Sequence, residues 1–138
     1  MITVTLEDVQ LLEFERIEDA RGNLSFFENH HQIPFTIKRV EYFYDIPGGK
    51  GFKGYAYKSR KELIVALSGS FDVIIDNGME RKCITLNRSY VGLYIPPGVW
   101  RQVKNFSTNS LALIATDDLY NETDYIRSLK EFIHLKDE

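Results

Sequence analysis

Two phenols, a carboxylate and a guanidinium are the residues of this sequence best suited to chemistry. Tyr55 and Tyr57 are separated by one residue, Glu62 follows shortly after, and Arg101 lies in a second stretch further along. A phenol with an ordinary pKa of about 10 holds its proton at neutral pH, and it acts as a base only where a nearby cation stabilises the phenolate. An arginine directed into a folded interior requires an anionic or carbonyl partner. Two interpretations of Tyr55 and Tyr57 are therefore open: phenols that shuttle protons in a site, or aromatic side chains that only fill the interior.

The same residues are poor ligands for a metal ion. Arg101 is always protonated and offers no free lone pair. Zinc and ferrous iron prefer imidazole or thiolate to phenol and carboxylate. We therefore expect neither a metal nor a cofactor. The cations available to stabilise a phenolate are Lys53, Lys58, Arg39 and Arg101.

Other reactive side chains have simpler interpretations. His30 and His31 are adjacent in a polar loop, and no further ligands stand at a workable spacing, so we expect solvated loop residues. The single cysteine, Cys83, excludes an internal disulfide framework and fits a reducing compartment. We expect it to be a buried structural thiol. Asp19 and Arg21 flank a turn, and an ion pair between them is favoured over contact with a ligand.

The elements that must position these side chains are predicted to be short β-strands. Alternation is strongest over residues 35–45, where Arg39 and Glu41 share a face. Residues 76–78, Asp-Asn-Gly, indicate a hairpin. Strands recurring every 8–12 residues are typical of an all-β sandwich or barrel. The predicted strands cover residues 9–17, 24–28, 35–45, 55–57, 62–67, 71–76, 81–86, 94–95, 100–105 and 110–116.

Only the C-terminal segment has a helical pattern. A short helix or irregular arm is expected to follow the sheet, with Thr123 or Asn121 available as its cap. The apolar residues at helical spacing are Tyr125, Ile126, Leu129 and Phe132.

Length and composition define the class of protein. No linker or repeat divides the chain, so residues 1–138 are predicted to form a single domain with a substantial core. The net charge of −3 is scattered, which gives no nucleic-acid-binding face. The N-terminus lacks the basic and apolar regions of a signal peptide, and no apolar run approaches the roughly 18 residues of a spanning helix. We expect a cytoplasmic protein with no membrane or nucleic-acid partner.

Both reactive stretches resemble the sequence motifs of cupins. Gly49, Glu62 and Gly69 fall at positions of the first motif, but tyrosine occupies both of its histidine positions. Residues 92–105 resemble the second motif, with Arg101 where metal cupins carry a histidine ligand. The resemblance implies an all-β jelly-roll β-barrel with a short C-terminal helix or arm. Adjacent strands then direct these side chains to one point inside the barrel.

A narrower resemblance covers residues 19–132. The segments IPFTIKRVEYFYDIPGG, YAYK in place of HAHK, ELIVALSGSFDVIIDNG, YIPPGVWRQVKNFS and ATDDLYNETDYIRSLKEFI are similar to the WxcM-like bacterial nucleotide-sugar 3,4-ketoisomerases. That family acts on dTDP-4-keto-6-deoxyglucose. The resemblance implies a homodimer, a metal-free tautomerisation through an enediol, and a place in deoxyamino-sugar biosynthesis for surface polysaccharides such as O-antigen.

The resemblance also implies roles for individual residues. In the family the two histidines of HAHK form the acid–base pair, so Tyr55 and Tyr57 occupy the catalytic positions. Arg101 is expected beside C4 of the sugar as a third catalytic residue. The residues expected to bind substrate are Arg39, Lys53, Glu62 and Trp100.

Structural roles remain open for several of these residues. Arg39 is almost as readily explained by an ion pair with Glu41 or Glu62, and Trp100 by packing in the core. For the whole chain, the alternative to an enzyme is a catalytically silent nucleotide-sugar-binding or regulatory cupin. A 3,5-epimerase is a third interpretation, but that activity usually depends on a His-Asp dyad, and no histidine is expected inside the barrel.

Overall fold

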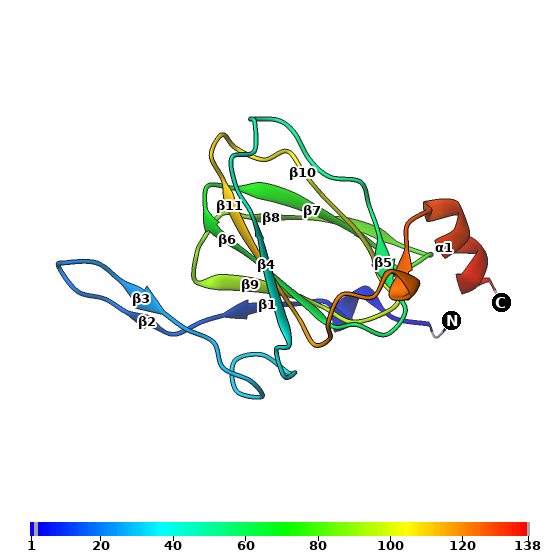
Figure 1. The fold of residues 1–138 in the computed structure, drawn as a ribbon, viewed down its shortest axis with the longest axis horizontal. Coiled ribbons are helices and arrows are strands. Elements are labelled where there is room, and N and C mark those ends of the chain that lie inside the picture. Colours follow the sequence, from blue (N-terminus) through cyan, green and yellow to red (C-terminus); the bar gives the residue numbers. More distant parts are fainter. Residues whose placement is uncertain (2, 138) are drawn as a thin grey trace.

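The computed structural model describes residues 1 and 3–137, which fold mainly as antiparallel strands followed by a C-terminal helix (Figure 1). The strands are β1 Gln10–Glu13, β2 Arg16–Ile17, β3 Leu24–Ser25, β4 Arg39–Phe43, β5 Ala56–Tyr57, β6 Glu62–Ser68, β7 Phe71–Asp76, β8 Arg81–Leu86, β9 Val91–Ile95, β10 Trp100–Lys104, β11 Leu111–Thr116 and β12 Tyr125–Ile126. The helices are two short 3₁₀ turns, η1 Leu6–Asp8 and η2 Glu122–Asp124, and the α-helix α1 Leu129–Lys136.

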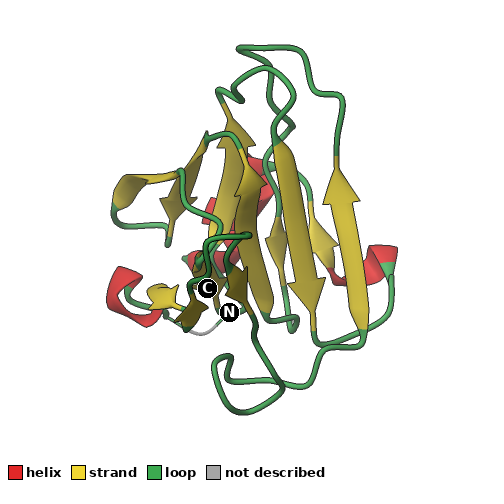
Figure 2. Ribbon diagram, turned by 90° about the vertical axis from the view of Figure 1, so that its left-hand side faces the viewer, coloured by secondary structure: helices red, strands yellow, loops and turns green. Residues whose placement is uncertain are grey.

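The strands build the two layers of a jelly roll (Figure 1, Figure 2). One layer is a five-stranded sheet in the order β1-β9-β6-β11-β4, and the other contains β10-β7-β8. An antiparallel bridge between Tyr55 and Arg101 connects the small β12–β5 pair to this second layer. The all-β jelly roll predicted from the sequence is confirmed, although its hydrogen-bonded ladders do not close into a continuous barrel.

Side-chain alternation along the strands places the main core between the layers. On β6, Ile64 and Ala66 belong to the inner core, whereas Leu63 and Val65 pack on the opposite face. Glu62 continues the inward row, so a carboxylate projects into the barrel. Each fully buried aliphatic side chain contributes about 1.5–3 kcal/mol relative to exposure. The inner core also includes Phe71, Val73, Ile75, Leu93, Ile95, Val103, Phe106 and Ile114.

Two smaller clusters cover the outside of the barrel. The outer face of the five-stranded sheet packs against Phe14, between β1 and β2, and against Ile33 and Phe35 from the long connection before β4. Near the C-terminus, α1 buries Phe132 against Trp100. This helix closes one side of the β5–β12 region, so it holds in place the strands that carry the predicted site.

Two turns predicted from composition are confirmed. The β7–β8 connection follows the Asp-Asn-Gly signal, and Gly78 adopts φ 93°, a left-handed conformation that favours glycine. Asp19 and Arg21 form the expected ion pair at 3.0 Å. His30 lies in an exposed loop and contacts the Thr36 hydroxyl at 2.8 Å, as expected for a solvated residue.

The C-terminal helix begins later than predicted. Tyr125 belongs to strand β12, which pairs with β5, and the α-helix starts only at Leu129. Ser128 caps this helix, because its hydroxyl accepts a hydrogen bond from the amide of Glu131. Asn121 caps the preceding 3₁₀ turn instead. Pairing with β5 therefore overrides the helical spacing of Tyr125.

Two further expectations from the sequence are wrong. Cys83 is exposed, because alternation on the edge strand β8 directs its neighbour Ile84 toward the core and Cys83 outward. The strand predicted over residues 9–17 is divided, since the chain turns inward at buried Phe14 between β1 and β2. Among the described residues, no helix is long and apolar enough to cross a membrane.

Candidate active site

The side chains predicted to do chemistry meet at one end of the barrel interior, around a pocket of about 320 Å³. Tyr55, Tyr57 and Lys53 line this pocket. Glu62 and Arg101 lie behind Tyr55 and are fully buried. The pocket is completed by Glu41, Phe43, Phe52, Tyr120, Tyr125 and Arg127.

Tyr55 and Arg101 are direct partners across two strands. The amide of Tyr55 donates to the carbonyl of Arg101 at 2.9 Å, and the amide of Arg101 donates back at 2.8 Å. Residues paired in this way project their side chains from the same face. The guanidinium carbon of Arg101 accordingly lies 5.2 Å from the ring centroid of Tyr55 and 5.1 Å from that of Tyr57. One cation therefore serves both phenol rings.

Glu62 reaches this pair from the opposite layer. The hydroxyl of Tyr55 donates to both carboxylate oxygens of Glu62, at 3.1 Å each. Arg101 donates from Nη1 to Glu62 at 3.0 Å and from Nη2 to the carbonyl of Val99 at 2.7 Å. Its Nε has no hydrogen-bond partner among the described residues. The result is a buried chain that runs from phenol to carboxylate to guanidinium.

Burial controls the acid–base properties of this chain. Burial raises the pKa of Glu62, although the guanidinium of Arg101 and the phenol donors oppose the shift. Burial and the charge of Glu62 raise the pKa of Tyr55 well above 10. Burial alone would lower the pKa of Arg101, but Glu62 and the two phenols raise it overall. At neutral pH, Tyr55 therefore holds its proton in a hydrogen bond to a carboxylate that is unusually ready to accept it.

Tyr57 is directed toward a different phenol. It is buried, and its hydroxyl donates to the hydroxyl of Tyr125 at 3.2 Å. Tyr57 and Tyr125 are register partners across β5 and β12. Arg60 lies beside both rings, with its guanidinium carbon 5.1 and 5.4 Å from their centroids, and it forms a buried ion pair with Asp124 at 3.7 Å. Burial, followed by the charge of Glu62, raises the pKa of Tyr57.

Charged side chains surround the mouth of the pocket. Arg127 binds Glu122 with two hydrogen bonds, at 2.6 and 2.8 Å, and its guanidinium carbon lies 4.1 Å from the ring centroid of Tyr125. Tyr120 donates to the same glutamate at 2.5 Å. Lys53 supplies a further cation at the rim. Because Arg127 is already paired with Glu122, Lys53 is the cation at the rim best placed to meet an anionic group.

Arg39 lies beside this rim. It forms an ion pair with Glu41 at 3.2 Å, which is one of the two roles that the sequence left open. Its guanidinium carbon is 5.5 Å from the ring centroid of Tyr120. Glu41 itself lines the pocket. Arg39 thus borders the site through its contacts with two lining residues.

The structure places Trp100 and Lys58 away from the pocket. Trp100 is the neighbour of Arg101 on β10, and alternation sends it to the opposite face, where it packs against Phe132. Lys58 follows Tyr57 and is among the residues that line another cavity. Lys58 was expected to be one of the cations near the phenols. The structure instead places Arg60 beside the ring of Tyr57, and reasoning from the sequence did not single out Arg60.

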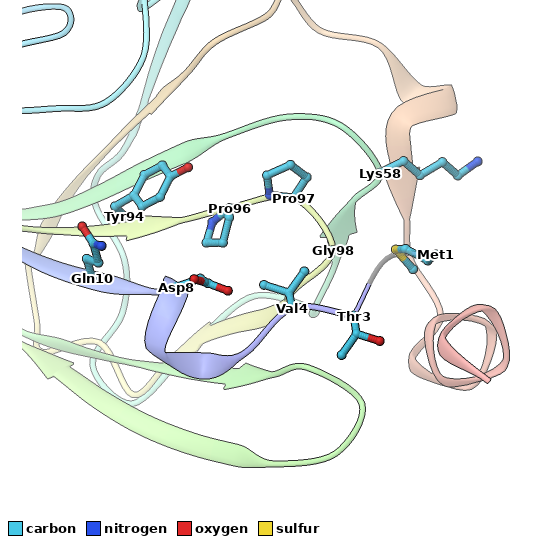
Figure 3. Close-up of a pocket in the computed structure, with 10 residues that line it drawn as sticks. All are labelled: Met1, Thr3, Val4, Asp8, Gln10, Lys58, Tyr94, Pro96, Pro97 and Gly98. Carbon is cyan, nitrogen blue, oxygen red and sulfur yellow. The ribbon is translucent and has the colours of Figure 1, made fainter. Parts of the chain in front are cut away.

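That second cavity, of about 500 Å³, lies between the N-terminal segment and the β9–β10 turn (Figure 3). Asp8 and Val4 line it from one side, and Pro96 and Pro97 line it from the other. Lys58, which directly follows β5, also lines it. Tyr55, Glu62 and Arg101 are not among the residues that line this cavity.

Several site residues were missed by reasoning from the sequence. Glu41 shares a face with Arg39, so its position on the inner side could have been inferred. Tyr125 was assigned to a helix face, and its pairing with Tyr57 is a long-range contact without a local signal. Tyr120 and Arg127 come from the C-terminal arm. No group of three His, Cys, Asp or Glu side chains that could hold a metal ion occurs among residues 1 and 3–137.

A jelly roll with an acid–base pocket inside the barrel defines a cupin-type protein. Within that class, the family model for FdtA, described as WxcM-like, C-terminal, matches residues 7–137. The chain belongs to this family.

Named relatives share most of the chain. The TDP-4-oxo-6-deoxy-alpha-D-glucose-3,4-oxoisomerase of Aneurinibacillus thermoaerophilus is 39% identical over 89% of this chain and 88% of its own length. The WlaRB TDP-quinovose 3,4-ketoisomerase of Campylobacter jejuni has a TM-score of 0.89 at 36% identity, covering 93% of this chain and 98% of that one. QdtA, a sugar 3,4-ketoisomerase from Thermoanaerobacterium thermosaccharolyticum solved in complex with TDP, has a TM-score of 0.92 at 34% identity. The match covers 96% of this chain and 97% of that one.

Proposed function

We propose that this protein is an isomerase that converts a TDP-4-keto-6-deoxyhexose to its 3-keto isomer, in the biosynthesis of deoxyamino sugars for surface polysaccharide. The observation that carries the proposal is the convergence of Tyr55, Glu62 and Arg101 at a pocket, in a chain whose relatives are 3,4-ketoisomerases. A single-residue mutant of QdtA has been solved in complex with TDP-4-keto-6-deoxyglucose, which supports this substrate class.

Tyr55 and Glu62 act together as the base. The oxygen of Tyr55 takes the proton from C3 of the sugar while its own proton passes to Glu62 along the existing hydrogen bond. This concerted transfer avoids a free phenolate, which the raised pKa of Tyr55 disfavours. The raised pKa of Glu62 suits it to accept the proton. Reversal of the same transfer at C4 completes the isomerisation.

Arg101 stabilises the charge that this transfer creates. Before the reaction, Glu62 neutralises the buried guanidinium at 3.0 Å. Once Glu62 is protonated, Arg101 keeps a positive charge without a buried counter-charge. The negative charge that the reaction creates in the adjacent pocket supplies that counter-charge, so the field of Arg101 favours the intermediate state over the ground state.

The cations of the rim bind the diphosphate. Lys53 and Arg127 line the mouth of the pocket, and Arg39 lies beside it through Glu41 and Tyr120. Guanidinium and ammonium groups form strong charge-assisted hydrogen bonds with phosphate oxygens. This arrangement holds the nucleotide outside and the sugar against Tyr55.

The direct test is conversion of TDP-4-keto-6-deoxyglucose, followed by NMR. The proposal predicts a 3-keto product that a 3-aminotransferase converts further. The second candidate is a catalytically silent sugar-nucleotide-binding cupin, because phenols stand in place of both imidazoles. Binding of the substrate without a 3-keto product would favour it. Exchange at C5 with no 3-keto product would instead indicate epimerase chemistry.

We further propose that the protein is a homodimer. The β2–β3 hairpin extends away from the body of the molecule (Figure 1), and Ile17 and Leu24, paired across it, are 52% and 56% exposed. An isolated two-stranded hairpin is marginally stable in water, so a second copy is the expected support. Sedimentation should give a dimer, and Ile17→Ser with Leu24→Ser should weaken it; a monomeric wild type would contradict the proposal.

A cytoplasmic location is proposed as a consequence of the activity. A sugar linked to a nucleoside diphosphate carries charges that oppose passage through a lipid bilayer. The enzyme therefore works in the compartment where its substrate is made. Cell fractionation with an antibody to the chain would test this, and recovery outside the cytoplasmic fraction would contradict it.

A further inference from the structure

Four phenols surround the pocket, and three of them donate their protons to protein groups. Tyr55 donates to Glu62, Tyr57 donates to Tyr125, and Tyr120 donates to Glu122. No described residue accepts a hydrogen bond from the hydroxyl of Tyr125. Tyr125 itself lines the pocket. Its proton is the one that remains available to a ligand.

Tyr125 is held firmly in this position. Its backbone pairs with that of Tyr57, and the next residue, Ile126, is fully buried beneath α1. Its ring centroid lies 4.8 Å from that of Tyr57 and 5.8 Å from that of Tyr55. The three phenols thus form one cluster at the base of the pocket, with Tyr125 partly exposed to it.

A hydrogen-bond donor and two cations surround Tyr125. The hydroxyl of Tyr57 already points at its oxygen from 3.2 Å and remains a donor when that oxygen becomes negative. Two guanidinium groups lie beside the ring: Arg127 at 4.1 Å and Arg60 at 5.4 Å from the centroid. Arg127 is fixed there by its paired hydrogen bonds to Glu122.

We propose that Tyr125, rather than Tyr57, is the second acid–base catalyst, and that it exchanges protons with the sugar oxygens. The proposal rests on the proposed 3,4-ketoisomerase function. In the first step, the Tyr55–Glu62 pair takes the C3 proton and Tyr125 gives its proton to the C4 carbonyl oxygen, which yields the enediol. In the second step, the Tyr125 phenolate takes the proton from the C3 hydroxyl while Tyr55–Glu62 returns a proton to C4. Each group ends as it began, so no further reactant is needed.

Tyr57 then has a supporting role. It is buried, and its proton is committed to Tyr125. It positions Tyr125 and stabilises the phenolate without itself exchanging a proton with the sugar. Replacement of Tyr57 by phenylalanine should therefore reduce activity less than the same replacement of Tyr125.

The test compares Tyr125→Phe with the control Tyr42→Phe. Tyr42 is 60% exposed and lies on the face of β4 opposite to the pocket residues Glu41 and Phe43. Tyr125→Phe should lower kcat by about 100-fold, within the usual range for a general acid–base group. KM should change by less than about threefold, TDP affinity should be retained, and the circular dichroism spectrum should be that of the wild type. Tyr42→Phe should match the wild type in every measurement.

Fluorotyrosines provide a test that is independent of folding. When 3-fluorotyrosine and 3,5-difluorotyrosine replace Tyr125, kcat should change progressively with phenol acidity, whereas the same replacements at position 42 should have no effect. Full kcat in Tyr125→Phe, or no response to fluorination, would overturn the role of Tyr125 while leaving an active ketoisomerase. An inactive wild type would overturn both this inference and the proposed function.

Discussion

The hydroxyl of Tyr55 donates to both carboxylate oxygens of Glu62, at 3.1 Å each, inside a barrel where Glu62 is fully buried. This contact joins the two layers of the jelly roll, because Tyr55 precedes β5 and Glu62 begins β6 in the facing sheet. A phenol alone is a weak base at neutral pH. Under the proposed function, Tyr55 becomes a usable base because it can pass its own proton to the buried carboxylate of Glu62.

The ion pair between Glu62 and Arg101 should be necessary for stability. Both side chains are fully buried, so removal of either charge leaves the other without a partner. Glu62→Gln and Arg101→Gln should each lower the free energy of unfolding by about 3–5 kcal/mol. The double variant should lose less than the sum of the two. Urea denaturation measures this coupling, and additive losses would show that the pair does not interact as described.

The pH dependence of kcat/KM should show a raised acidic limb. Glu62 must be ionised to receive the proton, and its pKa in the folded protein lies above the ordinary value of 4.5. Activity should therefore fall as the pH drops through a midpoint above 4.5. The pKa values of Tyr55 and Tyr57 are raised above 10, so loss of the proton from either of these two phenols should cause no alkaline decline centred below that value. An acidic midpoint at or below 4.5 would argue against Glu62 as the acceptor.

The rim cations should control affinity for the nucleotide. Lys53→Ala and Arg127→Ala should each weaken TDP binding by about 10–100-fold, since a hydrogen bond to a charged group contributes about 1.5–3 kcal/mol. The loss should shrink at high salt because these side chains are near the surface. Lys130→Ala, on the exposed side of α1, serves as the control. Calorimetry measures all three, and wild-type affinity in the two rim variants would remove Lys53 and Arg127 from the binding site.

Trp100 should act through packing. Its ring is 6% exposed and lies 6.0 Å from the ring centroid of Phe132, on the face of β10 opposite to Arg101. Trp100→Ala should lower the free energy of unfolding by about 3–5 kcal/mol. The folded variant should bind TDP with an affinity close to that of the wild type. Lost affinity at unchanged stability would instead support the substrate-binding role expected from the sequence.

Much of the fold could be predicted because its signals are local. Period-two alternation and the Asn-Gly turn indicate most strands, and the resemblance of the stretch with Gly49, Glu62 and Gly69 to the first cupin motif implies the jelly roll. The direction of Arg101 into the barrel and its need for an anionic partner also follow from the sequence. The structure identifies that partner as Glu62.

The rest depends on contacts between distant segments. The pairing of Tyr125 with Tyr57 joins residues that are far apart in the chain, and no local pattern distinguishes it from a helix start. Arg60 was not singled out because its partners, Asp124 and Asn121, lie in the C-terminal arm. The exposed position of Cys83 depends on β8 being an edge strand, which only the sheet order establishes.

Deuterium exchange at C3 tests the central claim most directly. With TDP-4-keto-6-deoxyglucose in D₂O, the wild type should exchange the C3 proton, and NMR follows the loss of its signal. Tyr55→Phe leaves the Glu62–Arg101 ion pair in place but removes the proton carrier, so exchange should slow by about 100–10,000-fold. Tyr42→Phe should exchange at the wild-type rate. Exchange by Tyr55→Phe as fast as by the wild type would contradict the assignment of Tyr55 and Glu62 as the base.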